Sequence, residues 1–531
     1  MNLEERGLYH PPNVNFFMVE KEEYAERPVP ESARLGFLRP AMVWAGFAYA
    51  YICKFIGSQI VAGLGAPMGY VAIVTGQIFL FVYSGLIAHM GSKFGFNFGM
   101  MCKAAFGRYG YAAPTLLIAA LVTGWYAFQA WLAADLMIGL YGGQSFNAGT
   151  GSGILPGILG TTGFWAGIFA IVFGMMAVYG MRIMAYMSYI AVGSVTILTG
   201  WMFYTILTVI AADTGGNPWS SPVVGEPWTF SLGFTASIGT FIVSSTMTAD
   251  FVRWTKSAKQ AWAVTLVAFP VCNLMMLMLG GIFTAVAGEL DFYFGLSALL
   301  FGIPIMLIQW FSNGSVCDGC LYNAAQGYKN VLYNLLRGKN IGINLSYRKV
   351  ALIAMLVGTA VAASNILTSI VPWLLLLGTV VTLVGGVLIG HFWIVARRSS
   401  LDELLIASEK KINIPAVVGF LSGLPIAVVL LTAYTELPSV VGGLIGGIVI
   451  YPLVARVTGY TKDGRLTPKA LGTGVGYDAS GVKKDSDTPS PPGGTTSIQA
   501  SDDRMQNRID KLIEFFAPNW VTSSFRGGRY K

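Results

Sequence analysis

The chain has 531 residues, of which 54% are hydrophobic and only 11% are charged, with a formal net charge of +8. Soluble domains carry about 25% charged residues, so this composition excludes an ordinary soluble protein and indicates an integral membrane protein. A basic chain can bind nucleic acid, but in a membrane protein basic residues usually record orientation, and their placement decides between the two.

The N-terminal 36 residues are the first recognisable segment. They contain several glutamates and no apolar run, so they cannot be a cleaved secretory signal. We therefore expect the first span itself to direct insertion, with residues 1–36 as a cytoplasmic tail.

Apolar stretches of spanning length, about 20 residues each, follow along the chain. Twelve are found, at 37–60, 68–91, 112–140, 162–180, 184–212, 232–250, 260–287, 296–325, 349–366, 371–392, 413–433 and 439–456. With the N-terminus inside, every Lys and Arg except Lys54 lies in an inner loop, in one of the two tails or at the inner end of a span, as Arg39 does. This is the positive-inside pattern, so the basic charge reports orientation and not nucleic-acid binding. We predict an all-α integral protein of the plasma membrane with both termini cytoplasmic.

The first span carries the first candidate functional residue. Its stretch Val43–Gly65 contains four glycines and one lysine, Lys54. An ammonium group near the hydrocarbon centre costs at least about 2.5–3.5 kcal/mol on insertion scales, so it normally faces a water-filled cavity or a partner charge. Interrupted helices in transporters offer backbone carbonyls to substrates and ions. We interpret this span as one wall of a transport site; a glycine-rich packing face with Lys54 reaching outward is the alternative.

Spans three and six supply candidate aromatic contacts. Trp125 stands near the centre of span three, where interfacial anchoring does not explain a tryptophan. A flat side chain there can stack on a planar ring, and Phe241 of span six is a candidate for the other side of that ring. Aromatic packing without a ligand is the alternative.

Span six contains many small residues, so we predict that its helix is broken, like that of span one. Asp250 closes it at the inner end and is followed by Arg253. We interpret Asp250 as a gating residue in an ion-pair latch; a solvated helix end is the alternative.

Span eight, which includes the run QWFSNGSVCDGCLYNAAQGY, is unusually polar for a membrane helix. A bilayer tolerates such a helix where its polar face lines a cavity. Ser312, Ser315 and Asp318 are therefore candidates for binding a polar ring or a small cation. The Cys317-x-x-Cys320 pair resembles a metal or redox motif, but the histidines are distant in sequence, so we interpret both as packing residues.

The composition changes again after the last span. Residues 457–531 lack the aromatic and branched residues needed to bury a core, so we predict a cytoplasmic, largely disordered tail. Within it, apolar residues recur at helical spacing and predict a short amphipathic helix: Met505, Ile509, Leu512, Ile513 and Phe516. The transporter domain is then 37–456.

Several of these segments resemble the cytosine permeases of the nucleobase-cation-symporter-1 family. The matching pieces run in order along the chain: Val29–Arg34, Ala105–Gly110, Gly124–Trp125, Thr246–Arg253 and Asp318–Tyr322. The resemblance implies twelve helices in a five-plus-five inverted repeat with discontinuous helices one and six. It also implies alternating-access symport of a nucleobase-like molecule with sodium or protons.

The resemblance also implies roles for single positions. It places Trp125 and Phe241 against the substrate ring, and Gly46 beside the substrate. It places the backbone at Gly46 and Ala50 near a coupling cation, and Ser315 at one of two hydroxyl ligands of that cation.

Other positions depart from the family pattern. The second hydroxyl ligand is replaced by Val316, and the polar residues near the substrate appear as Val122, Val243 and Ser312. An apolar residue is replaced by Lys54. These departures place cytosine itself in doubt as the substrate.

The same departures bear on the coupling ion. Sodium needs several oxygen ligands, and Val316 removes one. We hypothesise sodium-independent transport in which Lys54 or Asp318 exchanges protons; the alternatives are that Asp318 restores the missing ligand or pairs with Lys54. No cofactor other than Na⁺ or H⁺ is implied.

The function that follows is import of a nucleobase or a related planar heterocycle, such as cytosine, another pyrimidine, a purine or a ureide, by a secondary active transporter. The partners are this small molecule and membrane lipid. The alternative is a membrane receptor or regulator that binds such a ligand without net transport. An enzyme has little support, because no nucleophile–base pair, metal cluster or phosphate loop appears in the sequence.

Overall fold

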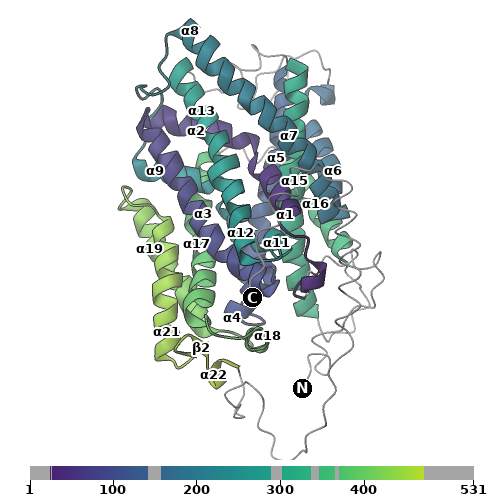
Figure 1. Ribbon diagram of the computed structural model, residues 1–531, viewed down its shortest axis with the longest axis vertical. Helices are drawn as coiled ribbons and strands as arrows, with labels where there is room; N and C mark the ends of the chain where they lie inside the picture. The colour runs from purple at the N-terminus through teal and green to yellow at the C-terminus, as the bar shows by residue number, and fades with distance from the viewer. Residues whose placement is uncertain are drawn as a thin grey trace, which may run out of the picture. The chain divides into compact units, whose positions relative to one another are not determined.

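Helices account for nearly all of the regular structure (Figure 1). The structure, a computed structural model, describes Tyr24 and residues 27–140, 157–288, 302–336, 346–364 and 370–471. The predicted amphipathic helix of the C-terminal tail lies outside these residues.

The first half of the described chain, up to the end of the broken span six, contains η3 (Glu31–Ala33), α1 (Leu38–Ala48), α2 (Tyr51–Leu64), α3 (Met68–Phe94), α4 (Phe98–Phe106), α5 (Ala112–Leu140), η4 (Gly157–Gly160), α6 (Thr162–Tyr179), α7 (Met181–Thr205), η5 (Ile206–Ile210), α8 (Ala211–Thr214), α9 (Phe230–Gly239), α10 (Ile242–Thr246) and α11 (Ala249–Val252). The turn η5 is π-helical and continues α7 into α8.

The second half contains α12 (Ala258–Leu266), η6 (Val267–Asn273), α13 (Leu274–Ala287), α15 (Gly302–Leu336), α16 (Tyr347–Ala363), α17 (Ile370–Gly390), η7 (His391–Val395), α18 (Leu401–Ser408), α19 (Ile414–Thr432), α20 (Val440–Leu444), η8 (Ile445–Ile450), α21 (Tyr451–Val457), β1 (Thr461–Lys462), β2 (Arg465–Leu466) and α22 (Pro468–Leu471). The strands β1 and β2 form an antiparallel hairpin. Pro270 lies inside the π-helical segment η6, where its missing N–H interrupts the α-helical pattern.

Eight helices among the described residues are long and apolar enough to cross a membrane, and the bent pair α1 and α2 would make nine. Helices also occupy the other predicted spans, but α9 to α11 are broken, α16 has 17 residues, and α15 is rich in polar side chains. The count of twelve spans and the inverted repeat therefore stay predictions.

Glycines let α2 approach α13 closely. A Cβ atom built on Gly280 would lie 1.7 Å from the carbonyl oxygen of Lys54, and one built on Gly57 would lie 1.9 Å from that of Leu277. The predicted alternative of a glycine packing face is thus partly right for span one. The outward-reaching lysine is wrong, because Lys54 is fully buried.

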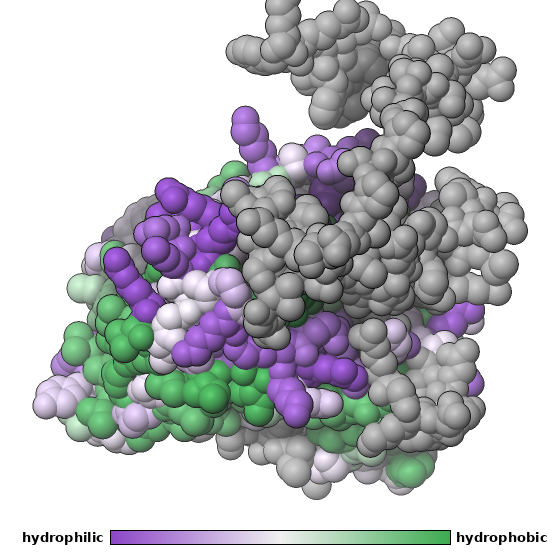
Figure 2. All heavy atoms as spheres, turned by 90° about the horizontal axis from the view of Figure 1, so that it is seen from below, coloured by the Kyte–Doolittle hydropathy of each residue, from purple (hydrophilic) through white to green (hydrophobic). Residues whose placement is uncertain are grey.

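The packed unit is longer than predicted at both ends. Before α1, the Val29 amide donates to the Gly95 carbonyl and the Leu35 amide to the Trp254 carbonyl. After α21, the hairpin is fixed by the buried side chain of Leu466 and by an ion pair between Arg465 and Glu403 at 2.7 Å. Figure 2 shows hydrophilic side chains gathered on the face that carries these ends, beside hydrophobic ones.

Candidate substrate and cation site

Span one is broken where its backbone was expected to be interrupted. The helix α1 ends at Ala48, α2 begins at Tyr51, and their axes differ by 51°. Between them Tyr49 and Ala50 leave the helical conformation, which frees backbone carbonyls. The Ser312 hydroxyl of α15 donates to the Tyr49 carbonyl. The Ser312 hydroxyl therefore stabilises the break in span one through this hydrogen bond.

Span six is broken as predicted. The helix α9 ends at Gly239, and α10 starts at Ile242, with Phe241 at φ −135° and ψ 6° between them. A Cβ atom on Gly239 would lie 2.9 Å from the backbone oxygen of Leu374, so α17 crowds the helix just before the break. The two broken helices meet through their aromatic side chains.

An aromatic cluster joins these breaks. Phe241 packs edge-on against Phe47, with ring centres 5.6 Å apart, and against Trp44 at 6.2 Å. Phe251 and Phe269 complete the cluster around Trp44, at 5.0 and 5.5 Å. Flat apolar surfaces from α1, η6 and the broken span six therefore surround one point.

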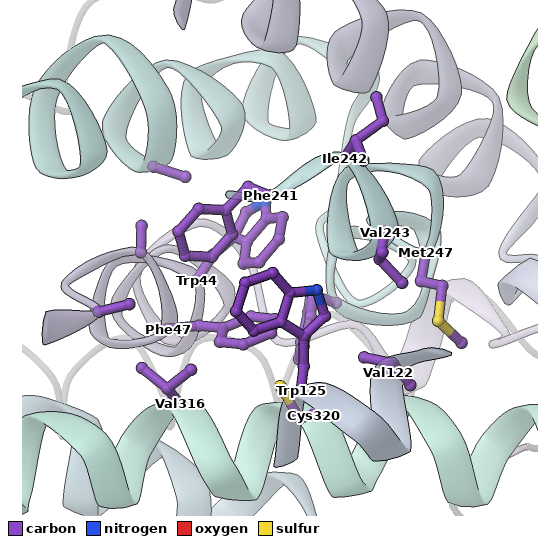
Figure 3. Close-up of a cluster of buried hydrophobic side chains, with 14 of the residues drawn as sticks. Trp44, Phe47, Val122, Trp125, Phe241, Ile242, Val243, Met247, Val316 and Cys320 are labelled. Carbon is purple, nitrogen blue, oxygen red and sulfur yellow. The ribbon is translucent and has the colours of Figure 1, made fainter. Parts of the chain in front are cut away.

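Trp125 of α5 enters the same cluster (Figure 3). Its indole lies with Phe47, Phe241, Val122 and Val243, and it is 4% exposed. The predicted substrate residues Trp125, Phe241 and Val243 are thus brought together. Trp125 and Phe241 do not stack on each other, so a planar ligand between them would have to displace part of the packing.

Gln129 is a candidate that sequence reasoning missed. It follows Trp125 by one turn of α5, so both lie on the same face of that helix. The side chain is 1% exposed, and its Oε1 atom has no hydrogen-bond partner. A buried acceptor in that state is costly unless a ligand or water donates to it. The spacing of four from Trp125 was the available signal.

The predicted cation residues are only partly assembled. A Cβ atom on Gly46 would lie 2.6 Å from the Ser315 Oγ and 3.0 Å from the Ser188 Oγ, and the two hydroxyls lie 3.0 Å apart. Ser188, on α7, was not predicted, and it places a second hydroxyl beside that of Ser315, where Val316 has none. The carbonyl of Ala50 accepts the Cys53 amide.

Lys54 and Asp318 are both fully buried. The Lys54 ammonium lies 3.9 Å from the Met202 sulfur of α7 and 5.9 Å from the centre of the Tyr51 ring. Asp318 lies on α15, and no side chain of the described residues hydrogen-bonds to its carboxylate oxygens, whose backbone interaction is with the amide of Gly319. A buried, unpaired carboxylate is strongly disfavoured, so this group requires a proton or a cation.

Other polar side chains of α15 are also buried without a hydrogen-bond partner. The side-chain nitrogen and oxygen atoms of Asn313, Asn323 and Gln326 are buried, and none has a hydrogen-bond partner. Folded proteins leave few such groups without water or a ligand. Span eight therefore carries buried polar groups that a ligand or water could satisfy, and the binding role that its composition suggested stays a prediction.

Asp250 and Arg253 are buried, so the alternative of a solvated helix end is wrong, and the gating role of Asp250 stays a prediction. The Asp250 carboxylate accepts the Phe98 amide at 2.7 Å and so caps α4. The Arg253 guanidinium donates to the Tyr24 carbonyl at 2.7 Å and to the Tyr322 hydroxyl at 3.3 Å. These contacts tie the N-terminal segment, α4 and α15 to the end of span six.

Metal-binding clusters of three or more His, Cys, Asp or Glu side chains do not occur among the described residues. All five cysteines are buried thiols. The Cys317 thiol lies 3.6 Å from the Tyr126 carbonyl, in a packed position.

Comparison with known proteins places this geometry in a family. Residues 28–451 match the model of permeases for cytosine and purines, uracil, thiamine and allantoin. The cytosine permease of Escherichia coli K12 is 24% identical over 441 residues, which cover 83% of this chain and 97% of the relative.

Two solved structures share the fold. Mhp1, a nucleobase-cation-symport-1 family transporter in a closed conformation with bromovinylhydantoin bound, aligns with a TM-score of 0.68 and 17% identity, covering 82% of this chain and 97% of its own. A Na⁺-coupled sialic acid symporter aligns with a TM-score of 0.53 and 12% identity, covering 81% and 92%. The family match, which extends over most of the chain, shows that this membrane protein belongs to the cytosine and purine permeases of the nucleobase-cation-symporter-1 family.

Proposed function

We propose that the chain is a secondary active transporter that imports a nucleobase or a related planar heterocycle. It has twelve spans in a five-plus-five inverted repeat and cytoplasmic termini. The observation that carries this proposal is the meeting of two helix breaks, at Tyr49–Ala50 and at Phe241, around one aromatic cluster that includes Trp125. Breaks of this kind are where transporters bind their substrates.

The chemistry of the cluster defines the substrate class. Aromatic rings favour a flat ligand, and the unpartnered Gln129 oxygen favours one that carries an N–H donor. Val122 and Val243 add only apolar surface (Figure 3). Pyrimidines, purines and ureides all combine a flat shape with N–H groups, so the substrate is one of these classes.

The coupling ion in this proposal is a proton that Asp318 binds and releases. Its carboxylate is fully buried and has no side-chain hydrogen-bond partner in the described residues, so moving a proton to or from it changes the energy of this conformation more than at an exposed carboxylate. Sodium is the second candidate, because the Ser188 and Ser315 hydroxyls converge beside Gly46. Hydroxyl and carbonyl oxygens are the ligands that hard cations prefer.

Uptake into proteoliposomes under an imposed proton gradient, with sodium replaced by choline, tests the coupling. We expect uptake to persist, to be lost in Asp318→Asn and to be kept in Ser315→Ala. Uptake that stops in choline, returns with sodium alone and is lost in Ser315→Ala would reject proton coupling and favour the hydroxyl pair.

A further inference from the structure

A cavity of about 350 Å³ lies away from the aromatic cluster, at the end of the helices that the proposal places in the cytoplasm. It is enclosed by the segment 27–34 before α1, the junction of α3 and α4, the last turns of α15, and α18. Its volume falls at the small end of the range of ligand pockets, about 300–1,000 Å³. Nothing in the proposed transport cycle uses this cavity.

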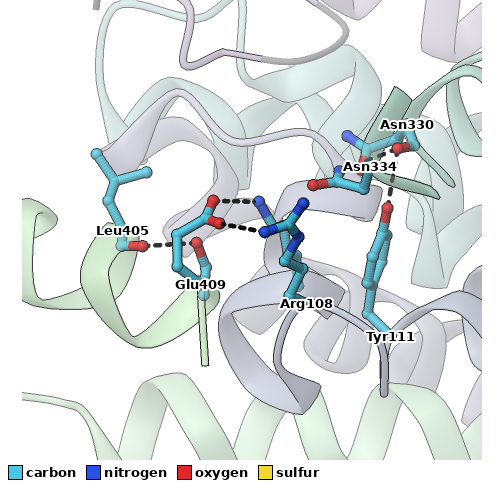
Figure 4. Close-up of polar contacts among 8 residues, drawn as sticks. Arg108, Tyr111, Asn330, Asn334, Leu405 and Glu409 are labelled. Carbon is cyan, nitrogen blue, oxygen red and sulfur yellow. Dashed lines mark hydrogen bonds and ion pairs between the residues drawn. The ribbon is translucent and has the colours of Figure 1, made fainter. Parts of the chain in front are cut away.

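Basic side chains outnumber acidic ones in its wall. The charged groups are Arg27, Arg34, Lys93 and Lys103 against Glu31 and Glu409. Glu409 is already neutralised, since it lies 2.7 Å from the Lys103 ammonium and 3.8 Å from the guanidinium of Arg108 (Figure 4). With Lys103 and Glu409 paired, Arg27, Arg34 and Lys93 face only Glu31, so the wall carries a net positive charge.

Arg34 is the clearest sign that this wall can bind an anion. Its Nε atom is buried and has no hydrogen-bond partner. Burial lowers the pKa of the guanidinium, and the nearby Glu31 offsets only part of that effect. A planar guanidinium with a free N–H matches the oxygens of a phosphate, and the Lys93 ammonium in the same wall supplies a second charge.

The remaining wall suits a ring or a sugar. Asn334 is 5% exposed, and its Nδ2 donates to the Asn330 carbonyl at 3.1 Å, while its Oδ1 has no partner. Figure 4 shows both amides beside Tyr111, whose hydroxyl fixes the Asn330 carbonyl at 2.8 Å. Phe94, Phe96 and Tyr333 also line the cavity. A buried acceptor next to aromatic rings fits an amino or hydroxyl donor on a stacked group.

We propose that this cavity is a regulatory site for a nucleoside monophosphate. The phosphate binds Arg34 and Lys93, and the nucleoside lies against Asn334 and the aromatic side chains. This inference rests on the proposed function, because cells that use an imported base attach it to a ribose phosphate. A nucleotide at this site therefore reports that enough base has entered.

The place of the site explains how it would act. The segment 27–34 leads directly into α1, and Val29 and Leu35 already tie it to the α3–α4 junction and to Trp254. A ligand that joins this segment to the end of α3 and to α15 strengthens the same attachment. It would hold the inner end of α1 in place and slow the cycle.

Calorimetric titration of the full chain in nanodiscs tests the site directly. Cytidine and adenosine 5′-monophosphates are the probes, and we expect one site that binds at least one of them about tenfold or more tightly than cytidine, adenosine or inorganic phosphate. Equal affinity for inorganic phosphate, or no nucleotide binding, would overturn the inference. Binding only of vesicles that contain a phosphorylated phosphoinositide would also overturn it, in favour of a lipid headgroup.

Variants then locate the binding. Arg34→Gln and Asn334→Ala should each lower nucleotide affinity about tenfold or more, whereas Lys256→Gln, an exposed cation outside the cavity, should not. A matching melting temperature without nucleotide controls for folding. Wild-type affinity in both cavity variants would contradict the proposal.

Transport gives a separate readout. Nucleotide trapped inside the vesicles should slow base uptake by the wild type and not by Arg34→Gln. A chain that binds nucleotide but moves no base would refute the proposed function alone. A chain that moves base but binds no nucleotide would refute this inference alone.

Discussion

Trp125 and Phe241 present flat surfaces to one buried point, from α5 and from the break in span six (Figure 3). Trp125→Ala should lower substrate affinity by about 1–3 kcal/mol, as removal of an aromatic stacking surface does for bases elsewhere. A scintillation proximity assay with radiolabelled substrate measures this affinity. Trp219→Ala, at a tryptophan that is 66% exposed, is the control and should bind normally. An unchanged affinity in Trp125→Ala would remove ring stacking from the account.

The Gln129 amide should matter through its hydrogen bond. Gln129→Leu keeps the volume and removes the acceptor, so substrates with an N–H donor should bind about 1–3 kcal/mol more weakly. The affinity for a flat analogue that lacks N–H groups, measured by competition, should change little. If the affinities for both ligands fall equally, Gln129 contributes packing and no hydrogen bond to the substrate.

Sequence reasoning singled out those candidate site residues whose type is unusual for their place in a span. An aspartate in span eight and a lysine in span one are expensive in a bilayer unless they are used, and a tryptophan at mid-span is not explained by anchoring at the interface. Gln129 and Ser188 were missed for different reasons. Gln129 has a signal in its spacing from Trp125, whereas Ser188 meets Ser315 only because α7 packs beside α15.

At the scale of the helices, small residues predicted which spans are broken. They could not predict the residues of the break, because Tyr49 and Ala50 leave the helix through tertiary contacts such as the Ser312 hydroxyl. The Asp250 carboxylate likewise caps α4, a helix that lies more than 140 residues away in sequence. Contacts between distant segments leave no local pattern.

The close contact of α2 with α13 should depend on Gly280. Gly280→Ala places a methyl group against the Lys54 carbonyl, so we expect a destabilisation of about 1–3 kcal/mol, as for other overpacked cores. A melting curve followed by fluorescence in detergent measures this loss of stability. Gly193→Ala on α7, where nothing lies within 4 Å of the added atom, should melt like the wild type. Equal melting temperatures would show that these helices do not pack as described.

For the whole molecule, the distribution of Lys and Arg fixes the orientation that we expect. All five native cysteines are buried, so an added cysteine can be labelled against a low background. A cysteine replacing the exposed Ser220 should react with an impermeant maleimide added to intact cells, and one replacing the exposed Thr458 should react only after lysis. The reverse result would invert the topology.

The breadth of the family match explains why the fold was predictable. Hydropathy and charge suffice for a helical membrane protein, and short motifs in chain order suffice for the family. The ends were harder to predict. The residues after 456 and before 37 are polar enough to be interpreted as tails, yet in the described parts, 27–36 and 457–471, buried side chains such as Val29, Tyr460 and Leu466 pack against the helices.

The central claim is that this site moves its ligand across the membrane and does not merely sense it. Purified protein in proteoliposomes, given radiolabelled pyrimidines, purines and ureides under an imposed cation gradient, measures this directly. We predict that at least one of them accumulates inside above its external concentration, and that dissipating the gradient abolishes the accumulation. Specific, saturable binding with no accumulation under either a proton or a sodium gradient would contradict the account and favour a receptor.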